Sequence, residues 1–309
     1  MYCGWGPANG GRWLRRRPRP WRSYRTASPY TCGRASAVEA QSSTIDRLTI
    51  AGKRTSHCDD VIDRAFRAFD SEHPDAGFAP VVAVIAALDE EGALGPVLRE
   101  LPAEACGLQV DALVVDDGSA DATSAVARAG GAYVVRLERN CGHGVALRVG
   151  YSLARERGAR FLVTLDGDGQ WNPSELARVL EPVAAGEADF AIGSRVLGAA
   201  ETDDAFRQAG VHVFGALVRV LTGSEVTDTS SGFRAMRVEV TETVRQDQVQ
   251  YQTSELLIGA LAQGYRVVER PITMRKRMAG QSKKGHNVLY GMRYARVIVS
   301  TWARERRRA

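Results

Sequence analysis

Two aspartates, Asp166 and Asp168, flank a glycine directly after the apolar run at residues 161–165. Two carboxylates at this spacing on a turn can face one cation, and oxygen ligands suit hard ions such as Mg²⁺ or Mn²⁺. Such an ion would bridge a bound diphosphate and neutralise the charge that develops on a leaving group. The alternative interpretation is an Asx-type turn that caps a helix beginning at Pro173.

Two further acidic turns follow apolar runs in the same way. The three turns are LDE at 88–90, DDGS at 116–119 and DGDGQ at 166–170. In an open α/β sheet, ligands bind outside the carboxyl ends of the strands, so three acidic turns at one edge indicate a binding site. Ser119 or Asp121 is also suited to N-cap the next helix. Both interpretations can hold, because Asp117 can still accept a hydrogen bond from a base or ribose.

Apolar runs alternate with helical segments from residue 81 onward. Strands are expected at 81–87, 112–115, 132–136, 161–165 and 188–192, and helices at 91–101, 121–129, 143–157 and 173–184. This alternation predicts an α/β fold with a doubly wound, mostly parallel sheet flanked by helices. Beyond residue 193 we expect helices at 206–221 and 254–263, a strand at 265–270 and a basic loop at 275–284.

The basic charge is concentrated in the first part of the chain. The net charge is +5, but residues 1–34 carry eight arginines and no acid, so the remainder sums to 5 − 8 = −3. We expect a disordered basic tail at 1–58, with a nucleic-acid-binding or lipid-binding arm as the alternative. Because the expected folded body is acidic, a nucleic-acid-binding function is not expected.

Three further segments follow this tail. Residues 59–79 are expected to form a short helix and linker, and residues 80–285 the main domain. Ile62, Ala65, Phe66 and Phe69 would share one face of the short helix. Residues 286–309 are expected to form an amphipathic helix whose apolar stripe comprises Val288, Met292, Ala295, Val299 and Trp302. Arginines at 293, 296, 304 and 306–308 would let this helix rest on an anionic membrane; the alternative is a helix packed on the domain.

The cysteines and the hydropathy pattern bear on localisation. The five cysteines are odd in number and lack CxxC spacing, which argues against a disulfide framework or zinc site and favours a reducing compartment. Cys106 and Cys141 are interpreted as ordinary small apolar residues. No apolar run approaches the roughly 18–20 residues that span a bilayer. The Arg-rich start lacks the apolar core of a signal peptide. We expect a cytoplasmic protein and leave open a peripheral contact at the inner face of the membrane.

A set of motifs in a fixed order resembles a known family. The motifs are VIAALDE (84–90), VVDDGSAD (114–121), NCGHGVALRVGYSLA (140–154), DGDGQWNP (166–173), GSR (193–195), DTSSGFRA (228–235) and RMAGQSKKG (277–285). Together they resemble family 2 glycosyltransferases of the GT-A fold, and within them the polyprenyl- and dolichyl-phosphate sugar synthases. The resemblance implies an inverting glycosyltransferase that uses a UDP- or GDP-sugar, a polyprenyl phosphate acceptor, and Mg²⁺ or Mn²⁺.

The resemblance also implies roles for individual residues. Asp117 would read the base, Arg195 and Arg207 would meet the acceptor phosphate, and Asp228 would line the acceptor side. Arg277 and Lys283 belong to a loop that closes over the donor phosphates. The implied nucleotide-sugar contacts are Ala86, Leu88, Glu90, Val115, Asp117, Asp166, Gly167, Asp168, Arg277 and Lys283. The implied metal ligands are Asp166, Asp168 and Gln170, and the implied catalytic residues are Asp228, Arg195 and Arg207.

The sequence departs from the family pattern at two positions, and two alternatives to a polyprenyl-phosphate transferase stay open. The family usually has proline at the position of Ala86 and asparagine at that of Asp89, which affects donor specificity. A phosphate acceptor is already anionic near neutral pH, since its second pKa is about 6, and needs no strong base. A soluble hydroxyl acceptor would need one, for which Asp228 is the candidate. A non-catalytic nucleotide-sugar-binding protein is the other alternative, and the paired Asp166 and Asp168 argue against it.

Overall fold

The computed structural model describes residues 58–201, 205–278 and 288–308, without the side chains of residues 205–207 and 288–289. The strands are β1 (Val81–Ala87), β2 (Glu104–Ala105), β3 (Leu108–Asp116), β4 (Tyr133–Arg136), β5 (Phe161–Asp166), β6 (Phe190–Ala200), β7 (Arg234–Arg237) and β8 (Val267–Met274). The helical elements are α2 (Asp59–Glu72), α3 (Glu91–Glu100), α4 (Thr123–Ala129), α5 (His143–Glu156), η1 (Pro173–Glu175), α6 (Leu176–Ala184), α7 (Ala205–Thr222), α8 (Val238–Thr243), α9 (Gln252–Ala262) and α10 (Val288–Arg306).

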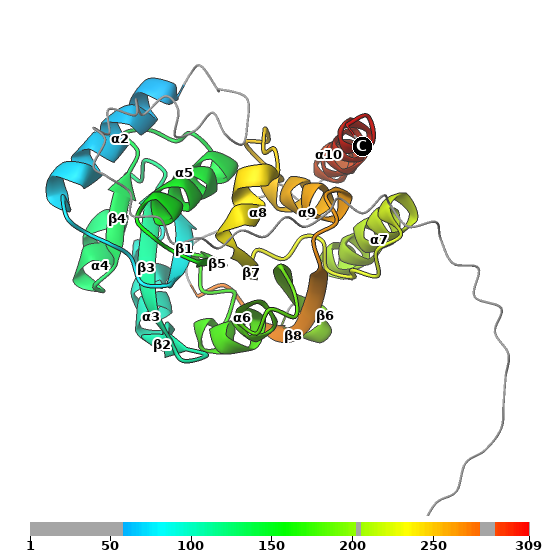
Figure 1. The fold of residues 1–309 in the computed structure, drawn as a ribbon, viewed down its shortest axis with the longest axis horizontal. Coiled ribbons are helices and arrows are strands. Elements are labelled where there is room, and N and C mark those ends of the chain that lie inside the picture. Colours follow the sequence, from blue (N-terminus) through cyan, green and yellow to red (C-terminus); the bar gives the residue numbers. More distant parts are fainter. Residues whose placement is uncertain (1–57, 202–204, 279–287, 309) are drawn as a thin grey trace, which may run out of the picture. The chain divides into compact units, whose positions relative to one another are not determined.

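These strands form one mixed sheet with helices on both faces (Figure 1). Its order is β2-β3-β1-β5-β7-β6-β8, and β4 also pairs with β3. β7 is antiparallel to both β5 and β6, whereas β1, β3, β4 and β5 are mutually parallel and β8 is parallel to β6. Every strand except β2 and β7 therefore points the same way. Their carboxyl ends meet at one edge, as a doubly wound α/β sheet predicts.

Strand β1 shows why the sheet takes helices on both faces. Its seven residues, VVAVIAA, are all buried. Val82 and Val84 pack into a core shared with α2, α5, α8 and α9, whereas Val81 and Ala83 pack into a second core shared with α3, α4 and α6. Because side chains alternate across a strand, a continuous apolar run buries both faces.

The predicted strands and helices are confirmed, while three short elements were not foreseen. β2, β7 and α8 span two, four and six residues, too few for a readable hydrophobic period. Of these, β7 matters most for the sheet, because it inserts antiparallel between β5 and β6 and separates the parallel strands β4, β3, β1 and β5 from the parallel pair β6 and β8.

Helix α2 carries the predicted apolar face. Ile62, Ala65, Phe66 and Phe69 are all buried. Residues 1–57 of the predicted tail (1–58) lie outside the described residues. Cys58, the last residue of that predicted tail, is described and belongs to the folded domain. It is buried, N-caps α2 and forms a disulfide with Cys141. The tail boundary at residue 58 is therefore wrong by one residue. The expectation of no disulfide, and of Cys141 as an ordinary small apolar residue, is wrong for this pair, so the cysteines no longer favour a reducing compartment.

Helices α7, α9 and α10 enclose a third, smaller core of Val218, Ile258, Tyr294 and Ile298. In α10 the predicted stripe is divided, because Trp302 packs against this core whereas other members of the stripe do not. Met292 and Val299 are exposed, and Tyr294 and Ile298 are the α10 residues buried in the core. Apolar residues occur on both faces of α10, so their spacing in the sequence does not show which face packs on the domain. Among the described residues, no helix is both long and apolar enough to cross a membrane.

Candidate active site

The turns after β1 and β3 are joined by backbone-to-side-chain hydrogen bonds. The Asp89 amide donates to Ser119 Oγ at 2.9 Å, and the Ala120 amide donates back to Asp89 Oδ1 at 2.8 Å. The Glu90 amide donates to Thr123 Oγ1 at 2.8 Å. Asp89 has a φ of 48°, a left-handed conformation that Asp and Asn tolerate better than most residues. The aspartate at this position therefore keeps the turn that an asparagine would form.

The two adjacent aspartates after β3 have different surroundings. Asp116 is fully buried and accepts hydrogen bonds from the Ser119 amide at 2.8 Å and from Ser124 Oγ. Arg136 completes its shell, with Nη1 at 2.9 Å from Oδ2. These partners hold the turn in place and identify Asp116 as a structural residue.

Asp117 instead reaches across to the loop that begins α5. Its two oxygens accept from the amides of Cys141 at 2.7 Å and Gly142 at 2.8 Å. Burial raises the pKa of Asp117 to about 6; the two amides act in the opposite direction, and the negative charge of Asp116 adds to the rise. A carboxylate oxygen has two lone pairs, so each oxygen can still accept a hydrogen bond from a ligand.

The DGDGQ turn after β5 places its aspartates in different contacts. Asp166 Oδ2 accepts from Trp171 Nε1 at 3.1 Å, and His143 Nε2 lies 3.8 Å from Oδ1. Asp168 is buried and accepts from the Gln170 amide at 3.0 Å. Gln170 is half-buried, and its carbonyl accepts from the Arg275 amide at 2.7 Å. The turn therefore lies against the end of β8.

The composition of this turn fits a hard divalent cation. Asp166, Asp168 and Gln170 offer only oxygen ligands, the preference of Mg²⁺ and Mn²⁺. In the described part of the chain, no group of three or more His, Cys, Asp or Glu side chains is arranged to hold a metal.

Arg277 connects the turns after β1 and β5. Its Nη1 lies 3.1 Å from Glu90 Oε1, and its Nη2 lies 2.6 Å from Asp168 Oδ2. The next residue, Met278, donates its amide to the Asp168 carbonyl at 3.3 Å. The basic loop thus starts directly above the acidic turns. Lys283, the other cation predicted in this loop, lies outside the described residues.

The remaining predicted nucleotide contacts line the same edge. Ala86 on β1 lies in register with Val115 on β3 and Asp166 on β5. Leu88 follows β1 and is half-buried. A Cβ on Gly167 would lie 3.3 Å from Ala87 Cβ, so a larger residue there would press on β1. Within the described residues, the structure therefore gathers the predicted donor residues at one edge.

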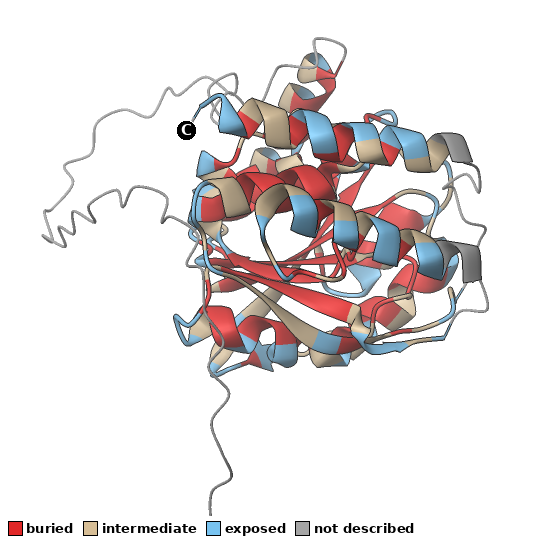
Figure 2. Cartoon of the chain, turned by 90° about the vertical axis from the view of Figure 1, so that its right-hand side faces the viewer, coloured by how far each residue is buried: buried red, intermediate tan, exposed pale blue. Residues whose placement is uncertain are grey.

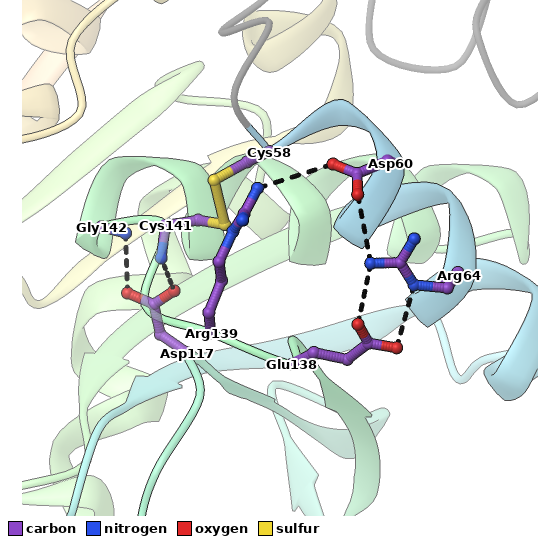
Figure 3. The surroundings of a disulfide bond; sticks show 8 residues. All are labelled: Cys58, Asp60, Arg64, Asp117, Glu138, Arg139, Cys141 and Gly142. Carbon is purple, nitrogen blue, oxygen red and sulfur yellow. Dashed lines mark hydrogen bonds and ion pairs between the residues drawn. A yellow bond between two sulfur atoms is a disulfide. The ribbon is translucent and has the colours of Figure 1, made fainter.

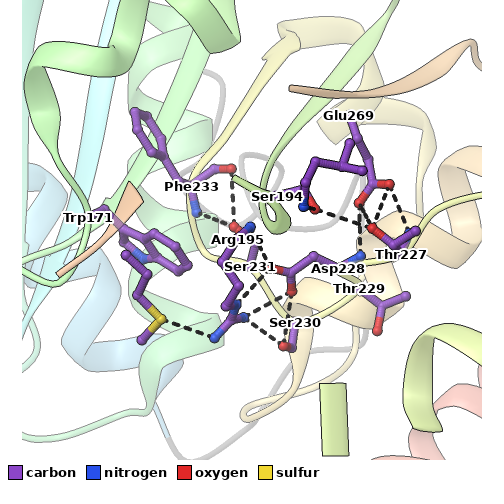
Figure 4. A network of polar contacts seen from close by, with 12 residues as sticks. Trp171, Ser194, Arg195, Thr227, Asp228, Thr229, Ser230, Ser231, Phe233 and Glu269 are labelled. Atoms are coloured by element: carbon purple, nitrogen blue, oxygen red, sulfur yellow. Dashed lines mark hydrogen bonds and ion pairs between the residues drawn. The ribbon is translucent and has the colours of Figure 1, made fainter. Parts of the chain in front are cut away.

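The second half of the site is a charged network centred on Arg195, midway along β6 (Figure 4). Arg195 makes a bidentate pair with Asp228, with Nε–Oδ2 at 2.7 Å and Nη2–Oδ1 at 2.9 Å. Arg195 Nη2 also donates to Ser230 Oγ at 2.9 Å. Asp228 is fully buried and the Arg195 side chain is 11% exposed. Arg195 and Asp228, which the sequence predicts as two separate site residues, therefore bind each other directly.

The loop that carries Asp228 is held from two sides. Glu269 on β8 accepts from the amides of Thr227 at 2.9 Å and Asp228 at 2.8 Å. Arg234, which is buried, donates to the carbonyls of Thr229 at 2.9 Å and Ser231 at 2.7 Å. Glu269 had no sequence signal. Arg234 lies inside the DTSSGFRA motif, but its structural role was not foreseen.

Trp171 links the two halves of the site. Its indole N–H binds Asp166, and its ring lies under the Arg195 guanidinium at 5.3 Å from centroid to Cζ. A Cβ on Gly232 would lie 2.9 Å from Asp166 Oδ2, so the loop after Asp228 also approaches the acidic turn closely. The position of Trp171 directly after DGDGQ was the available signal. Arg207 lies in α7, and its side chain is outside the described residues.

Comparison with known proteins identifies the family. Residues 82–245, more than half of the chain, match the model described as glycosyl transferase family 2. The chain belongs to glycosyl transferase family 2. This glycosyltransferase is 36% identical over 197 residues to a polyprenol monophosphomannose synthase of Mycolicibacterium smegmatis, covering 60% of this chain and 74% of that one. It is 34% identical over 206 residues to a dolichyl-phosphate hexose transferase of Haloferax volcanii, covering 67% and 87%.

Solved structures support the fold of this glycosyltransferase. Glucosyl-3-phosphoglycerate synthase from Mycobacterium tuberculosis, in complex with Mn²⁺, UDP and glucosyl-3-phosphoglycerate, superposes with a TM-score of 0.57. The match covers 77% of this chain and 82% of that one at 19% identity. At this identity the likeness concerns the fold alone, and it confirms the predicted GT-A fold.

Proposed function

We propose that this glycosyltransferase moves a sugar, with inversion, from a nucleotide-sugar to a polyprenyl phosphate. The observation that carries the proposal is the link made by Trp171 between the acidic turn and the Arg195–Asp228 pair. A donor diphosphate site and an anion site then lie side by side at one sheet edge. The polyprenyl- and dolichyl-phosphate transferases among the relatives support this acceptor class.

The chemistry follows from these positions. A phosphate oxygen of the acceptor attacks the anomeric carbon while the bond from that carbon to the nucleoside diphosphate breaks. Asp228 holds Arg195 through Nε and Nη2, and Arg195 would orient the acceptor phosphate with its Nη1 group and its positive charge. Arg277 would exchange its contacts with Glu90 and Asp168 for hydrogen bonds to the donor phosphates. The family resemblance assigns the same phosphates to Lys283. Asp166, Asp168 and Gln170 would hold a divalent cation, whose charge stabilises the leaving diphosphate.

The position of Asp228 argues against the alternative soluble hydroxyl acceptor. A general base must reach the proton that it removes. Asp228 is fully buried, and both its oxygens accept from Arg195. This geometry suits a residue that positions Arg195 and does not suit a base that meets substrate. A phosphate acceptor needs no such base, so the pairing favours the lipid phosphate.

Donor affinity should fall as the pH is lowered through about 6. Asp117, whose pKa burial raises to about 6, would accept from the base of the donor only in its ionised form. Below that pH the affinity should decrease about ten-fold for each pH unit. The diphosphate of a nucleotide-sugar is doubly esterified and does not titrate there. Calorimetric titration from pH 5 to pH 8 measures the effect. A slope that persists in Asp117→Asn would contradict this role.

A peripheral membrane contact would bring the lipid acceptor to the site. Helices α7 and α10 lie side by side, with Phe214 and Tyr294 in edge contact at 4.5 Å (Figure 2). Their outer faces expose Val220 at 82% and Met292 at 58%. The outer faces also carry Val213, Val299, Arg219, Arg293 and Arg296. Apolar residues interleaved with arginines are typical of a helix that lies on an anionic bilayer.

Reversing one charge on this face should weaken vesicle binding. Each basic charge near an anionic surface contributes about 1 kcal/mol, and Arg296→Glu changes the charge by two units, so it should lower partitioning roughly thirty-fold. Arg304 belongs to the basic set predicted from sequence but pairs with Asp247 and Glu255, so it is not chosen. Arg67→Glu, on the exposed side of α2, is the control and should bind like the unmodified protein. Sedimentation with phosphatidylglycerol vesicles measures this, and equal loss in both variants would contradict it.

Donor binding is tested by titration with UDP- and GDP-sugars. We expect one nucleotide class to bind in the presence of Mn²⁺ and to bind much more weakly in EDTA. Transfer of labelled sugar to a short polyprenyl phosphate, extracted into an organic phase, then tests the acceptor. Label that enters only a soluble alcohol would replace the proposed acceptor with the alternative.

A further inference from the structure

The loop at residues 138–142 holds Asp117 in place and is itself packed on three sides. Its amides at Cys141 and Gly142 bind both oxygens of Asp117. A Cβ on Gly118 would lie 2.5 Å from the Arg139 carbonyl carbon, and one on Gly142 would lie 2.2 Å from Val249 Cγ1. Both glycines have positive φ, 81° and 102°. The loop is therefore positioned by direct backbone contact with the Asp117 turn.

Helix α2 holds the outer side of this loop (Figure 3). Cys58, at the N-terminus of α2, forms a disulfide with Cys141. Arg64 donates to Glu138 at 2.8 and 2.9 Å, and Arg139 lies 3.6 Å from Asp60. These ion pairs are exposed, and exposed pairs contribute little to stability. The covalent bond is therefore the strongest connection between α2 and the loop.

We propose that the Cys58–Cys141 disulfide positions Asp117 for the donor nucleotide, so that donor affinity depends on the redox state of this pair. The disulfide joins residues 83 positions apart and ends on the residue whose amide binds Asp117. A preorganised loop loses less conformational entropy on binding. The inference rests on the proposed nucleotide-binding function and adds a residue pair that controls the same site.

The redox step requires a dithiol reductant. The dithiol transfers two electrons and two protons to the disulfide, so that Cys58 and Cys141 become thiols and the reductant becomes a disulfide. With the link broken, α2 holds the loop only through its exposed ion pairs and apolar packing. Asp117 should then sample positions that the two amides no longer fix.

The test uses the full chain with Cys3→Ser, Cys32→Ser and Cys106→Ser, which leaves only the pair of interest. UDP and GDP are titrated with Mn²⁺ before and after treatment with dithiothreitol. The nucleotide that binds should show a Kd about ten-fold higher after reduction, comparable to the loss of one hydrogen bond to a charged group. Cys58→Ser should give the higher Kd without reductant, and KM for the donor should rise while kcat changes little.

Two measurements keep this inference separate from the proposed function. Hydrogen exchange of the peptide around Cys141 should accelerate on reduction, whereas β1 should stay protected, whether or not a nucleotide binds. Alkylation of the denatured, unreduced protein should modify neither cysteine. If neither nucleotide binds, the proposed function fails while the exchange result still tests the loop. Unchanged exchange, an equal Kd in both states, or two alkylated cysteines before reduction would overturn the inference.

Discussion

Asp168→Asn is expected to lower kcat about a thousand-fold, because it removes one of two carboxylates proposed to hold the cation that stabilises the leaving diphosphate. The side chain keeps its shape, so the fold should survive. Asp168 also pairs with Arg277 at 2.6 Å, and its loss changes the charge that Arg277 faces. EDTA should reduce the unmodified enzyme to a similar level, and Mn²⁺ should restore the unmodified enzyme but not the variant.

Asp189→Asn provides a matched control for this change. Asp189 is also an ion-paired carboxylate, bound to Arg266 at 2.9 Å, but it precedes β6 and lies at the opposite edge of the sheet. It should retain full turnover. Steady-state kinetics and thermal melting of both variants, with and without EDTA, make the comparison. Normal activity of Asp168→Asn, or of the unmodified enzyme in EDTA, would remove the metal from the proposed mechanism.

Arg195→Lys and Asp228→Asn are each expected to lower transfer to polyprenyl phosphate about a hundred-fold, and the double variant should be little worse than either. The reason is that the two side chains form one bidentate unit. Lysine at position 195 keeps the positive charge but cannot make the bidentate contact with Asp228. Asparagine at position 228 leaves Arg195 without its counter-charge. Donor binding should stay close to that of the unmodified enzyme, since the proposed donor residues lie at or directly after the ends of β1, β3 and β5 and in the segment after β8.

The pair Arg266–Asp189 serves as the control for this cycle as well. It is bidentate, with contacts of 3.1 and 2.9 Å, and it is remote from the proposed site. Removing one partner of a buried pair such as Arg195–Asp228 costs about 3–5 kcal/mol of stability, so melting curves must accompany the kinetics of these variants. Additive losses would show that Arg195 and Asp228 act separately. A loss confined to donor affinity would show that the acceptor site lies elsewhere.

The strand-end residues could be predicted from the sequence because their signals are local. Asp166 and Asp168 stand in a short motif directly after an apolar run, and the parallel sheet then brings that motif beside Glu90 and Asp117. The order of the motifs along the chain also allowed the family to be predicted. These predictions required only strand positions and the rule that carboxyl ends share an edge.

The partners of these residues could not be predicted, since they come from distant segments. Asp228 meets Arg195 only because β7 inserts between β5 and β6, and β7 is too short to recognise from its pattern. Glu269 reaches the same loop from β8. Cys58 and Cys141 are 83 positions apart and lack a spacing signal. Such pairs depend on tertiary packing, which hydrophobic periods do not specify.

The most direct test of the proposed function is sugar transfer by the unmodified enzyme to a detergent-dispersed polyprenyl phosphate. UDP- and GDP-sugars labelled in the sugar are supplied one at a time with Mn²⁺, and the organic phase is counted over time. We predict that one donor gives a lipid-linked sugar, that EDTA abolishes it, and that the unphosphorylated polyprenol does not replace the acceptor. Equal transfer to the polyprenol, or label appearing only in soluble products, would contradict the phosphate acceptor on which the proposed roles of Arg195 and Asp228 depend.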